Sequence, residues 1–291
     1  MPRVCVVGSA NVDQVYWVDQ IPSPGETVLA SGFTTARGGK GQNQAVAAAR
    51  AGASVSFIGA VGTDAFGDLT SAGLADDGID IARLCRVASP TGTAIIAVDA
   101  AGENTIIVDS GANSTVNVED ADRAAIARAD VLLLQLEIPL PSVAAAAGAA
   151  REAGTTAILN AAPMASLPPE LLASVDVLVV NEHEAAQLRQ ESGVDDLTEL
   201  VPTVVVTLGG AGAELHARGA EVERVPAPSV PVVDSTGAGD TFCGAFAAAV
   251  GEGATPVDAL RFAVVAASLS VQREGAVPSI PARAEIDDAL A

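Results

Sequence analysis

The chain has 291 residues, of which 49% are hydrophobic, 3% aromatic and 18% charged, and its formal net charge is −21. This length and apolar content suffice for one large α/β domain, while the acidic balance excludes a basic face that would bind nucleic acid. No apolar run reaches the roughly 20 residues that span a bilayer, so we expect no membrane segment. Three scattered cysteines and two histidines argue against a disulfide framework or a structural zinc site, and favour a reducing cytoplasm.

Residues 4–8 predict a buried first strand, and two short polar side chains, Asn11 and Asp13, follow its C-terminal end. Ligands of open α/β sheets bind at that end, although an Asn-x-Asp pair is also common in turns. Short strands that interrupt the later strand–helix alternation are expected at 14–19, 27–33, 92–98 and 104–108. They predict a small accessory sheet within about 12–36 and 92–109.

A glycine-rich segment, Arg37-Gly38-Gly39-Lys40-Gly41-Gln42-Asn43-Gln44, opens a helix that runs through Arg50. Its glycines let the backbone approach a ligand closely. Lys40 and Asn43, three residues apart, share one face of the first turn. A lysine at a helix start is usually a surface residue, but Lys40 is the only lysine of the chain, which makes it a binding candidate.

The middle of the chain alternates strands and helices. We expect strands at 54–60, 131–136, 156–159, 175–180 and 204–207, a loop at 62–68, and helices at about 69–77, 119–128 and 142–154. This alternation predicts a mostly parallel sheet covered by helices on both faces. No internal repeat and no long flexible linker divides the chain, so residues 1–291 are expected to form a single domain.

A polar tetrapeptide, Asn181-Glu182-His183-Glu184, follows the strand at 175–180. Asn181 and Glu184 would lie on one face of a helix start, from which they could reach a magnesium ion bound to phosphate, and its waters. The same two residues suit an N-cap with an acidic first turn equally well.

A second glycine-rich turn, Asp234-Ser235-Thr236-Gly237-Ala238-Gly239-Asp240, leads into helix 239–250, and a further helix is expected at 257–271. The first N–H groups of a helix have no internal partner and carry the positive end of its dipole, so Gly237, Ala238 and Gly239 could cradle an anion. Asp240 would place a carboxylate base beside it. This equipment suits phosphoryl transfer to a hydroxyl, whereas the plainer alternative is a tight turn with an N-cap. No Walker A motif is present.

Both glycine-rich segments resemble the two signatures of the ribokinase-like family of sugar and nucleoside kinases. The resemblance extends over essentially the whole chain and includes Asn181-x-x-Glu184 and the loop Arg273-Glu274-Gly275-Ala276-Val277-Pro278-Ser279. It implies an α/β three-layer sandwich with a small β-sheet lid. The implied reaction moves the γ-phosphoryl group of ATP to the 5-hydroxyl of D-ribose.

The resemblance also implies roles for single residues. Asp240 is the implied base, and Gly237, Ala238 and Gly239 form the anion hole with it. The implied sugar-binding residues are Asn11, Asp13, Gly38, Gly39, Lys40, Asn43, Glu137 and Asp240. The implied nucleotide-binding residues are Asn181, Thr207, Gly209, Gly239 and Val264. Magnesium is assigned to Glu184 and Asn181 through water and phosphate, and an activating potassium ion to Asp234, Thr236, Arg273, Gly275 and Ser279.

The chain departs from the family pattern at two places that bear on nucleotide preference and on the shape of the nucleotide site. Val264 stands where His or Asn is common, and the segment at 193–202 is short. Alternative readings are a kinase for another pentose, deoxyribose or a nucleoside, or a non-catalytic sugar-binding sensor. Paired Asn11 and Asp13 favour a hydroxyl-rich sugar, and the scarcity of aromatic residues leaves little to stack a nucleobase on. The resemblance further implies a homodimer formed through the lid strands.

Overall fold

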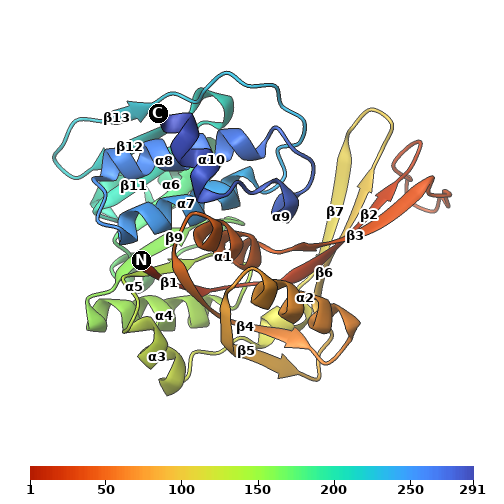
Figure 1. Ribbon diagram of the computed structural model, residues 1–291, viewed down its shortest axis with the longest axis horizontal. Helices are drawn as coiled ribbons and strands as arrows, with labels where there is room; N and C mark the ends of the chain where they lie inside the picture. The colour runs from red at the N-terminus through yellow and green to blue at the C-terminus, as the bar shows by residue number, and fades with distance from the viewer.

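The computed structural model describes residues 1–291, and its centre is a nine-stranded sheet with the order β13-β12-β11-β10-β9-β8-β1-β4-β5 (Figure 1). The strands from β11 to β5 in this order are parallel, and β12 and β13 continue the sheet in antiparallel pairing, with β13 at the edge. The strands are β1 (Arg3–Val7), β4 (Ser54–Gly62), β5 (Asp80–Val87), β8 (Val131–Leu134), β9 (Thr156–Asn160), β10 (Val177–Asn181), β11 (Thr203–Thr207), β12 (Ala213–Ala217) and β13 (Glu223–Val225). The predicted α/β class with a mostly parallel sheet is confirmed.

Helices cover both faces of this sheet. One face carries α1 (Lys40–Arg50), α2 (Ala65–Asp76), α7 (Ala238–Gly251), α8 (Pro256–Ser270) and α10 (Arg283–Leu290), and the other carries α3 (Asp120–Ile126), α4 (Leu140–Ala153), α5 (Pro169–Leu172) and α6 (Glu182–Ser192). Central strands are apolar on both sides, as buried parallel strands must be. In β8, Leu133 joins the first core and Leu132 and Leu134 join the second. None of the helices combines the length and apolar content that crossing a bilayer needs.

A separate four-stranded sheet, the lid, projects from this body beside α2 (Figure 1). Its order is β3-β2-β6-β7, with β2 (Asn11–Trp17), β3 (Gly32–Gly38), β6 (Gly92–Val98) and β7 (Asn104–Asp109). The expected accessory sheet is thus present, but the strand expected at 27–33 was misplaced. It lies at Gly32–Gly38 because it pairs antiparallel with β2, from Asn11 opposite Gly38 to Trp17 opposite Gly32.

Several elements lie where the sequence pattern indicated none: β5, β12, β13, α5, α9 (Ala276–Ser279) and α10. The three strands are outer strands of the main sheet, and β5 carries exposed charge at Arg86. They therefore lack the continuous apolar run of a central strand. Several expected ends also moved by one or two residues: β8 ends at Leu134 rather than at 136, and β10 starts at Val177 rather than at 175.

The chain reverses direction across the sheet at β1. From β1 it proceeds to β4 and β5 on one side, and it later returns to β8 on the other side of β1. Loops that leave the carboxyl ends of two such strands diverge and open a crevice. Asn11 follows β1 and Glu137 follows β8, so this topology brings both residues to one crevice.

Helices α1 and α7 pack unusually closely over this crevice. A Cβ atom added to Gly244 of α7 would lie 2.4 Å from the carbonyl oxygen of Gln44 and 2.5 Å from Cβ of Ala47, both on α1. Only glycine allows this approach. The close crossing carries the first turn of α7, with Asp240, against the first turns of α1.

Candidate active site

Asp240 lies in the first turn of α7 and is only 8% exposed. Its two carboxylate oxygens each accept one amide hydrogen bond from α1: Oδ2 from Nδ2 of Asn43 at 2.9 Å, and Oδ1 from Nε2 of Gln44 at 3.0 Å. Burial raises the pKa of Asp240, and the charge of Lys40 and the two amides offset this only in part. The carboxylate is therefore fixed in orientation and more basic than an exposed aspartate.

Lys40 is the first residue of α1, and its side chain is partly buried rather than on the surface. The ammonium group makes no hydrogen bond or ion pair within the chain. Burial lowers its pKa, but the carboxylates of Asp240 and Glu137 raise it more, so the net pKa is above the ordinary value. A charged donor without a protein partner is thus held among carboxylates.

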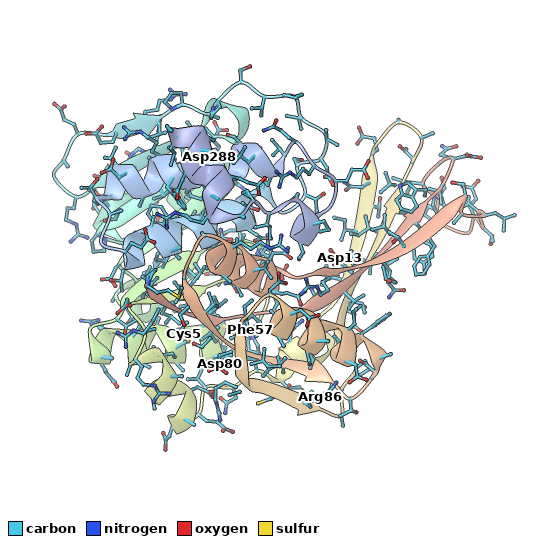
Figure 2. The ribbon with its side chains drawn as sticks, viewed as in Figure 1. Cys5, Asp13, Phe57, Asp80, Arg86 and Asp288 are labelled. Atoms are coloured by element: carbon cyan, nitrogen blue, oxygen red, sulfur yellow. The ribbon has the colours of Figure 1, made fainter.

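Asp13 lies on β2 at the root of the lid, where the lid joins the body (Figure 2). Its carboxylate covers Gly38: a Cβ atom on Gly38 would lie 2.2 Å from Oδ2 of Asp13. Burial, followed by the nearby carboxylates of Glu137 and Asp240, raises the pKa of Asp13 to about 6. Three carboxylates and one ammonium group therefore surround a single polar space.

Asn11 and Gly39 form the backbone wall of this space. Oδ1 of Asn11 accepts a hydrogen bond from Nδ2 of Asn113 at 2.7 Å, which fixes the amide of Asn11 with its Nδ2 unpaired. Gly39 is the N-cap of α1 with φ of 88°, and a Cβ atom there would lie 2.8 Å from the backbone nitrogen of Asn11. Glycine is required on both counts.

Glu137 is anchored through one oxygen. Its Oε2 accepts from the Ser9 hydroxyl at 2.6 Å and from the backbone N–H of Lys40 at 2.9 Å. The carboxylate therefore stabilises the N-terminus of α1. Its Oε1 makes no hydrogen bond within the chain and stays free to accept from a ligand.

The N-terminus of α7 has the properties of an anion site. Gly237 is the N-cap in the left-handed conformation, with φ of 73°. The N–H groups of Gly239 and Asp240 donate to no acceptor in the chain. A Cβ atom on Gly239 would meet only open space, so nothing in the protein itself requires glycine there. The space in front of these N–H groups is open to an anion.

A cavity of about 370 Å³ adjoins this helix start, between the turn after β11, the loop at 227–235 and helices α7 and α8. Four of the predicted nucleotide residues line it, namely Thr207, Gly209, Gly239 and Val264. Asn181 does not. Most of the lining was not predicted from the sequence, including Phe242, Ser268 and the apolar residues of the loop. Apolar side chains inside a Pro-punctuated loop were the signal that could have found it.

Asn181 and Glu184 form a reciprocal cap at the start of α6. The Asn181 backbone N–H donates to Oε2 of Glu184, and the Glu184 N–H donates to Oδ1 of Asn181, both at 2.8 Å. The capping alternative is therefore present. No group of three or more His, Cys, Asp or Glu side chains is arranged to hold a metal. A magnesium ion at Glu184 would depend on phosphate and water for its remaining ligands.

The predicted ion loop comes together around Asp234. Its Oδ1 accepts from the N–H and hydroxyl of Thr236, at 2.9 and 2.6 Å, and its Oδ2 accepts from the N–H of Gly275 at 2.8 Å. Ser279 is buried, with its hydroxyl donating to the carbonyl of Ala276. The guanidinium of Arg273 pairs with Glu285. A guanidinium is itself a cation and has no acceptor, so only the backbone carbonyl of Arg273 could ligate a cation.

Comparison with known proteins gives one consistent result. The family model described as pfkB family carbohydrate kinase matches residues 1–283. The ribokinase of Bacillus subtilis is 39% identical over 293 residues, covering all of both chains, and that of Haemophilus influenzae is 39% identical, covering 96% of this chain and 95% of its own. The solved structure of Arabidopsis thaliana ribokinase complexed with ribose and ATP superposes with a TM-score of 0.92 at 37% identity, over 99% of this chain and 98% of that chain.

Proposed function

Because this chain belongs to the pfkB family of carbohydrate kinases, we propose that it transfers the γ-phosphoryl group of ATP to the 5-hydroxyl of D-ribose, giving D-ribose 5-phosphate. The observation that carries this proposal is the placement of Asp240. Its buried carboxylate stands on the same helical turn as two backbone N–H groups without partners. A base and an anion site on one turn are the pair of groups that hydroxyl phosphorylation requires.

The acceptor side would bind the sugar through its hydroxyl groups. Carboxylates accept from hydroxyls, and the unpaired Oε1 of Glu137 and the carboxylate of Asp13 offer such acceptors. Nδ2 of Asn11 and the ammonium group of Lys40 supply donors. Gly38, Gly39 and Asn43 complete the wall. This set of charged and amide groups suits a polyhydroxylated ring better than an apolar base.

Asp240 would remove the proton of the acceptor hydroxyl as that oxygen attacks phosphorus. The N–H groups of Gly239 and Asp240, with that of Gly237 beside them, would stabilise the charge that develops on the transferring phosphoryl group. The N–H of Ala238, predicted to join them, instead donates to the carbonyl of Ser235 at 3.2 Å. Lys40, charged and without a protein partner, adds positive charge at the same point.

Two cations fit the residues present. Glu184, with Asn181, would hold magnesium through water and phosphate, and that ion would neutralise phosphate charge. Asp234, Thr236, Gly275, Ser279 and the carbonyl of Arg273 would hold potassium beside the anion site. The hydrogen bond from Gly275 to Asp234 already joins the two segments of that loop.

The lid supports a homodimer as part of the proposal. Ile106 and Val108 of β7 are each 53% exposed. They occupy the same cross-strand rows as Val15 and Asp13 of β2, so they share the face that carries Asp13. Apolar side chains on that face suit contact with the lid of a second copy.

An ADP-release assay with ATP and magnesium tests the function. We would compare D-ribose, deoxyribose, arabinose, xylose, fructose and adenosine, each with and without potassium. Selective turnover of ribose that potassium increases is the expected result. Preferential turnover of another acceptor would overturn the ribose assignment and keep the kinase chemistry. No turnover, with ribose still raising the melting temperature, would indicate the sugar-binding sensor.

A further inference from the structure

A chain of buried side-chain amides lies behind Asp240. Nε2 of Gln135, in the segment after β8, donates to Oε1 of Gln44 at 2.7 Å. Nε2 of Gln44 donates in turn to Oδ1 of Asp240 at 3.0 Å and to Oδ1 of Asn160, on β9, at 3.1 Å. Gln44 and Gln135 are both fully buried. Neither residue is among the groups that face the sugar or the nucleotide.

The order of donors and acceptors in this chain is directional. Because Gln135 donates to Oε1 of Gln44, the amide of Gln44 must present its nitrogen to Asp240 and Asn160. The reversed amide would set an oxygen against two oxygen acceptors and a nitrogen against a donor. Gln135 thus selects the one orientation of Gln44 in which a donor faces the carboxylate.

A glutamine at position 135 destabilises the fold. Its Oε1 is buried without any hydrogen-bond partner. The side chain fits only because Gly8 is a glycine, since a Cβ atom there would lie 1.9 Å from that oxygen. An apolar side chain like those of its neighbours Leu134 and Leu136 would avoid an unpaired acceptor. The benefit that offsets this cost must come from the donor, which points to Gln44.

From these contacts we propose that Gln44 is a positioning residue for the catalytic base and that Gln135 orients it, so that the two amides keep Asp240 ionised and fix its direction. This inference rests on the proposed role of Asp240 as the base. Asn43 serves the other carboxylate oxygen, so each oxygen receives one amide and retains a lone pair for the substrate proton.

Other titratable groups near Asp240 come from several elements. They are Lys40 on α1, Asp13 on β2, Glu137 after β8, Glu184 on α6 and Cys243 one turn further along α7. None of them forms a hydrogen bond with the side-chain amide of Gln44 or Gln135. A substitution in the amide chain therefore leaves these charges in place, and a changed pH profile reports the lost donor.

The test compares Gln44→Met and Gln135→Met with the matched control Gln42→Met. Gln42 is also on α1 and fully buried, but its Nε2 donates to the carbonyl of Gly38 at 2.7 Å and not to Asp240. The measurement is the single-turnover rate constant at saturating ribose and MgATP across pH, together with the ribose KM. Saturating sugar keeps Asp13 in its bound state, so the acid limb reports the base.

Loss of a donor to a carboxylate raises its pKa. In Gln44→Met we expect the midpoint of the acid limb to rise by about one pH unit, which corresponds to about 1.4 kcal/mol. Gln135→Met should raise the midpoint by less. The double variant should raise the midpoint no further than Gln44→Met alone does. Gln42→Met should raise the ribose KM and leave the midpoint unchanged.

An unmoved midpoint in Gln44→Met, or an equal shift in Gln42→Met, would overturn the inference. If Gln44→Met does not fold, Gln135→Met provides the test, because Gln135 does not hydrogen-bond to Asp240. An unmoved midpoint in Gln135→Met would then overturn the inference. Failure of the proposed function has a different signature. In that case wild type phosphorylates none of the acceptors, or Asp240→Asn keeps its rate, and the role of Gln44 falls with it.

Discussion

The two sides of the active site are built on different principles. On the acceptor side, Asp240, Asn43 and Gln44 are buried, and every link between them is a hydrogen bond within the chain. On the nucleotide side, Asn181 and Gly209 are exposed, and Gly239 faces open space. The chain itself therefore holds the candidate base in place before any ligand binds, whereas the nucleotide side is open.

The difference follows from what each side must do. A general base acts on one proton and must be held within hydrogen-bond reach in a fixed direction, which burial and amide donors provide. A triphosphate brings its own charges and its own metal ion, so the protein needs to supply N–H groups and room. Substitutions on the acceptor side should therefore change chemistry, and those on the nucleotide side should change ligand requirements.

The largest effect is expected from Asp240→Asn. Loss of general-base catalysis alone should lower the single-turnover rate by about 10²–10⁴-fold. The fold and ribose binding should persist, because an asparagine occupies nearly the same volume and its oxygen still accepts from one of the two amides that hold Asp240. Single-turnover kinetics measure the rate, and the rise in melting temperature with ribose measures binding. Retention of more than about a tenth of the wild-type rate would remove Asp240 from the role of base, since even the smallest expected loss is larger.

Asp13→Asn should give the next largest effect, and its two consequences have opposite signs. In the sugar-free protein the pKa of Asp13 is raised from 3.8 to about 6, so ionisation opposes folding as pH rises through this range. Removing the charge should therefore raise the melting temperature above pH 6 and leave it unchanged at acidic pH. Ribose affinity should fall by about 10–100-fold, because hydrogen bonds to a charged group are lost.

Ribose titrations between acidic and neutral pH separate these two effects. In wild type, affinity should weaken as pH falls through about 6, since the protonated carboxyl no longer accepts from two hydroxyls. In Asp13→Asn that dependence should disappear. A wild-type affinity that is flat over this range would contradict direct sugar binding by Asp13.

The sequence was sufficient to predict which polar groups come together, because these groups stand in glycine-rich segments at helix starts or directly after a strand. Asp13, Lys40 and Asp240 are distant along the chain, yet each follows a strand or opens a helix at the carboxyl edge of the sheet. Parallel topology alone then brings them to one crevice. The central strands were predictable for a related reason, since burial on both faces leaves an apolar run.

The sequence was insufficient to predict the residues that we propose position the base. Gln44 stands in an alanine-rich helix and Gln135 at the end of an apolar strand, and each could equally have faced water. Their roles depend on the close crossing of α1 and α7, which Gly244 permits. No local sequence pattern predicts that crossing. The outer strands β12 and β13 were missed because both are short and only partly buried, so neither carries an apolar run.

Glu184→Gln tests the nucleotide side with a smaller expected effect. Glutamine at this position can still accept the N–H of Asn181, so the cap and the melting temperature should be preserved. The negative charge that would attract magnesium is lost, so about tenfold more magnesium should be needed for half-maximal rate, as an outer-shell ligand typically costs 10–100-fold. Unchanged magnesium dependence would leave the residue with its capping role alone.

The smallest effects, and the sharpest contrast between the two sides, should come from adding one methyl group at each of two glycines of α7. Gly244→Ala drives Cβ to within 2.4 Å of the Gln44 carbonyl oxygen, so it should cost about 1–3 kcal/mol of unfolding free energy through overpacking. Gly239→Ala meets no protein atom, and replacing a helical glycine should stabilise the chain by about 0.5–1 kcal/mol.

Activity should separate the same pair in a second way. The methyl group in Gly239→Ala enters the space before the free N–H groups, so the KM for ATP should rise while the KM for ribose stays constant. Gly244→Ala should instead pull Gln44 away from Asp240 and lower the rate of the chemical step. Denaturant titration and initial rates measure both. The two substitutions, five residues apart on one helix, would then change the free energy of unfolding in opposite directions. That contrast would show that the acceptor side depends on internal packing and the nucleotide side on space for its ligand.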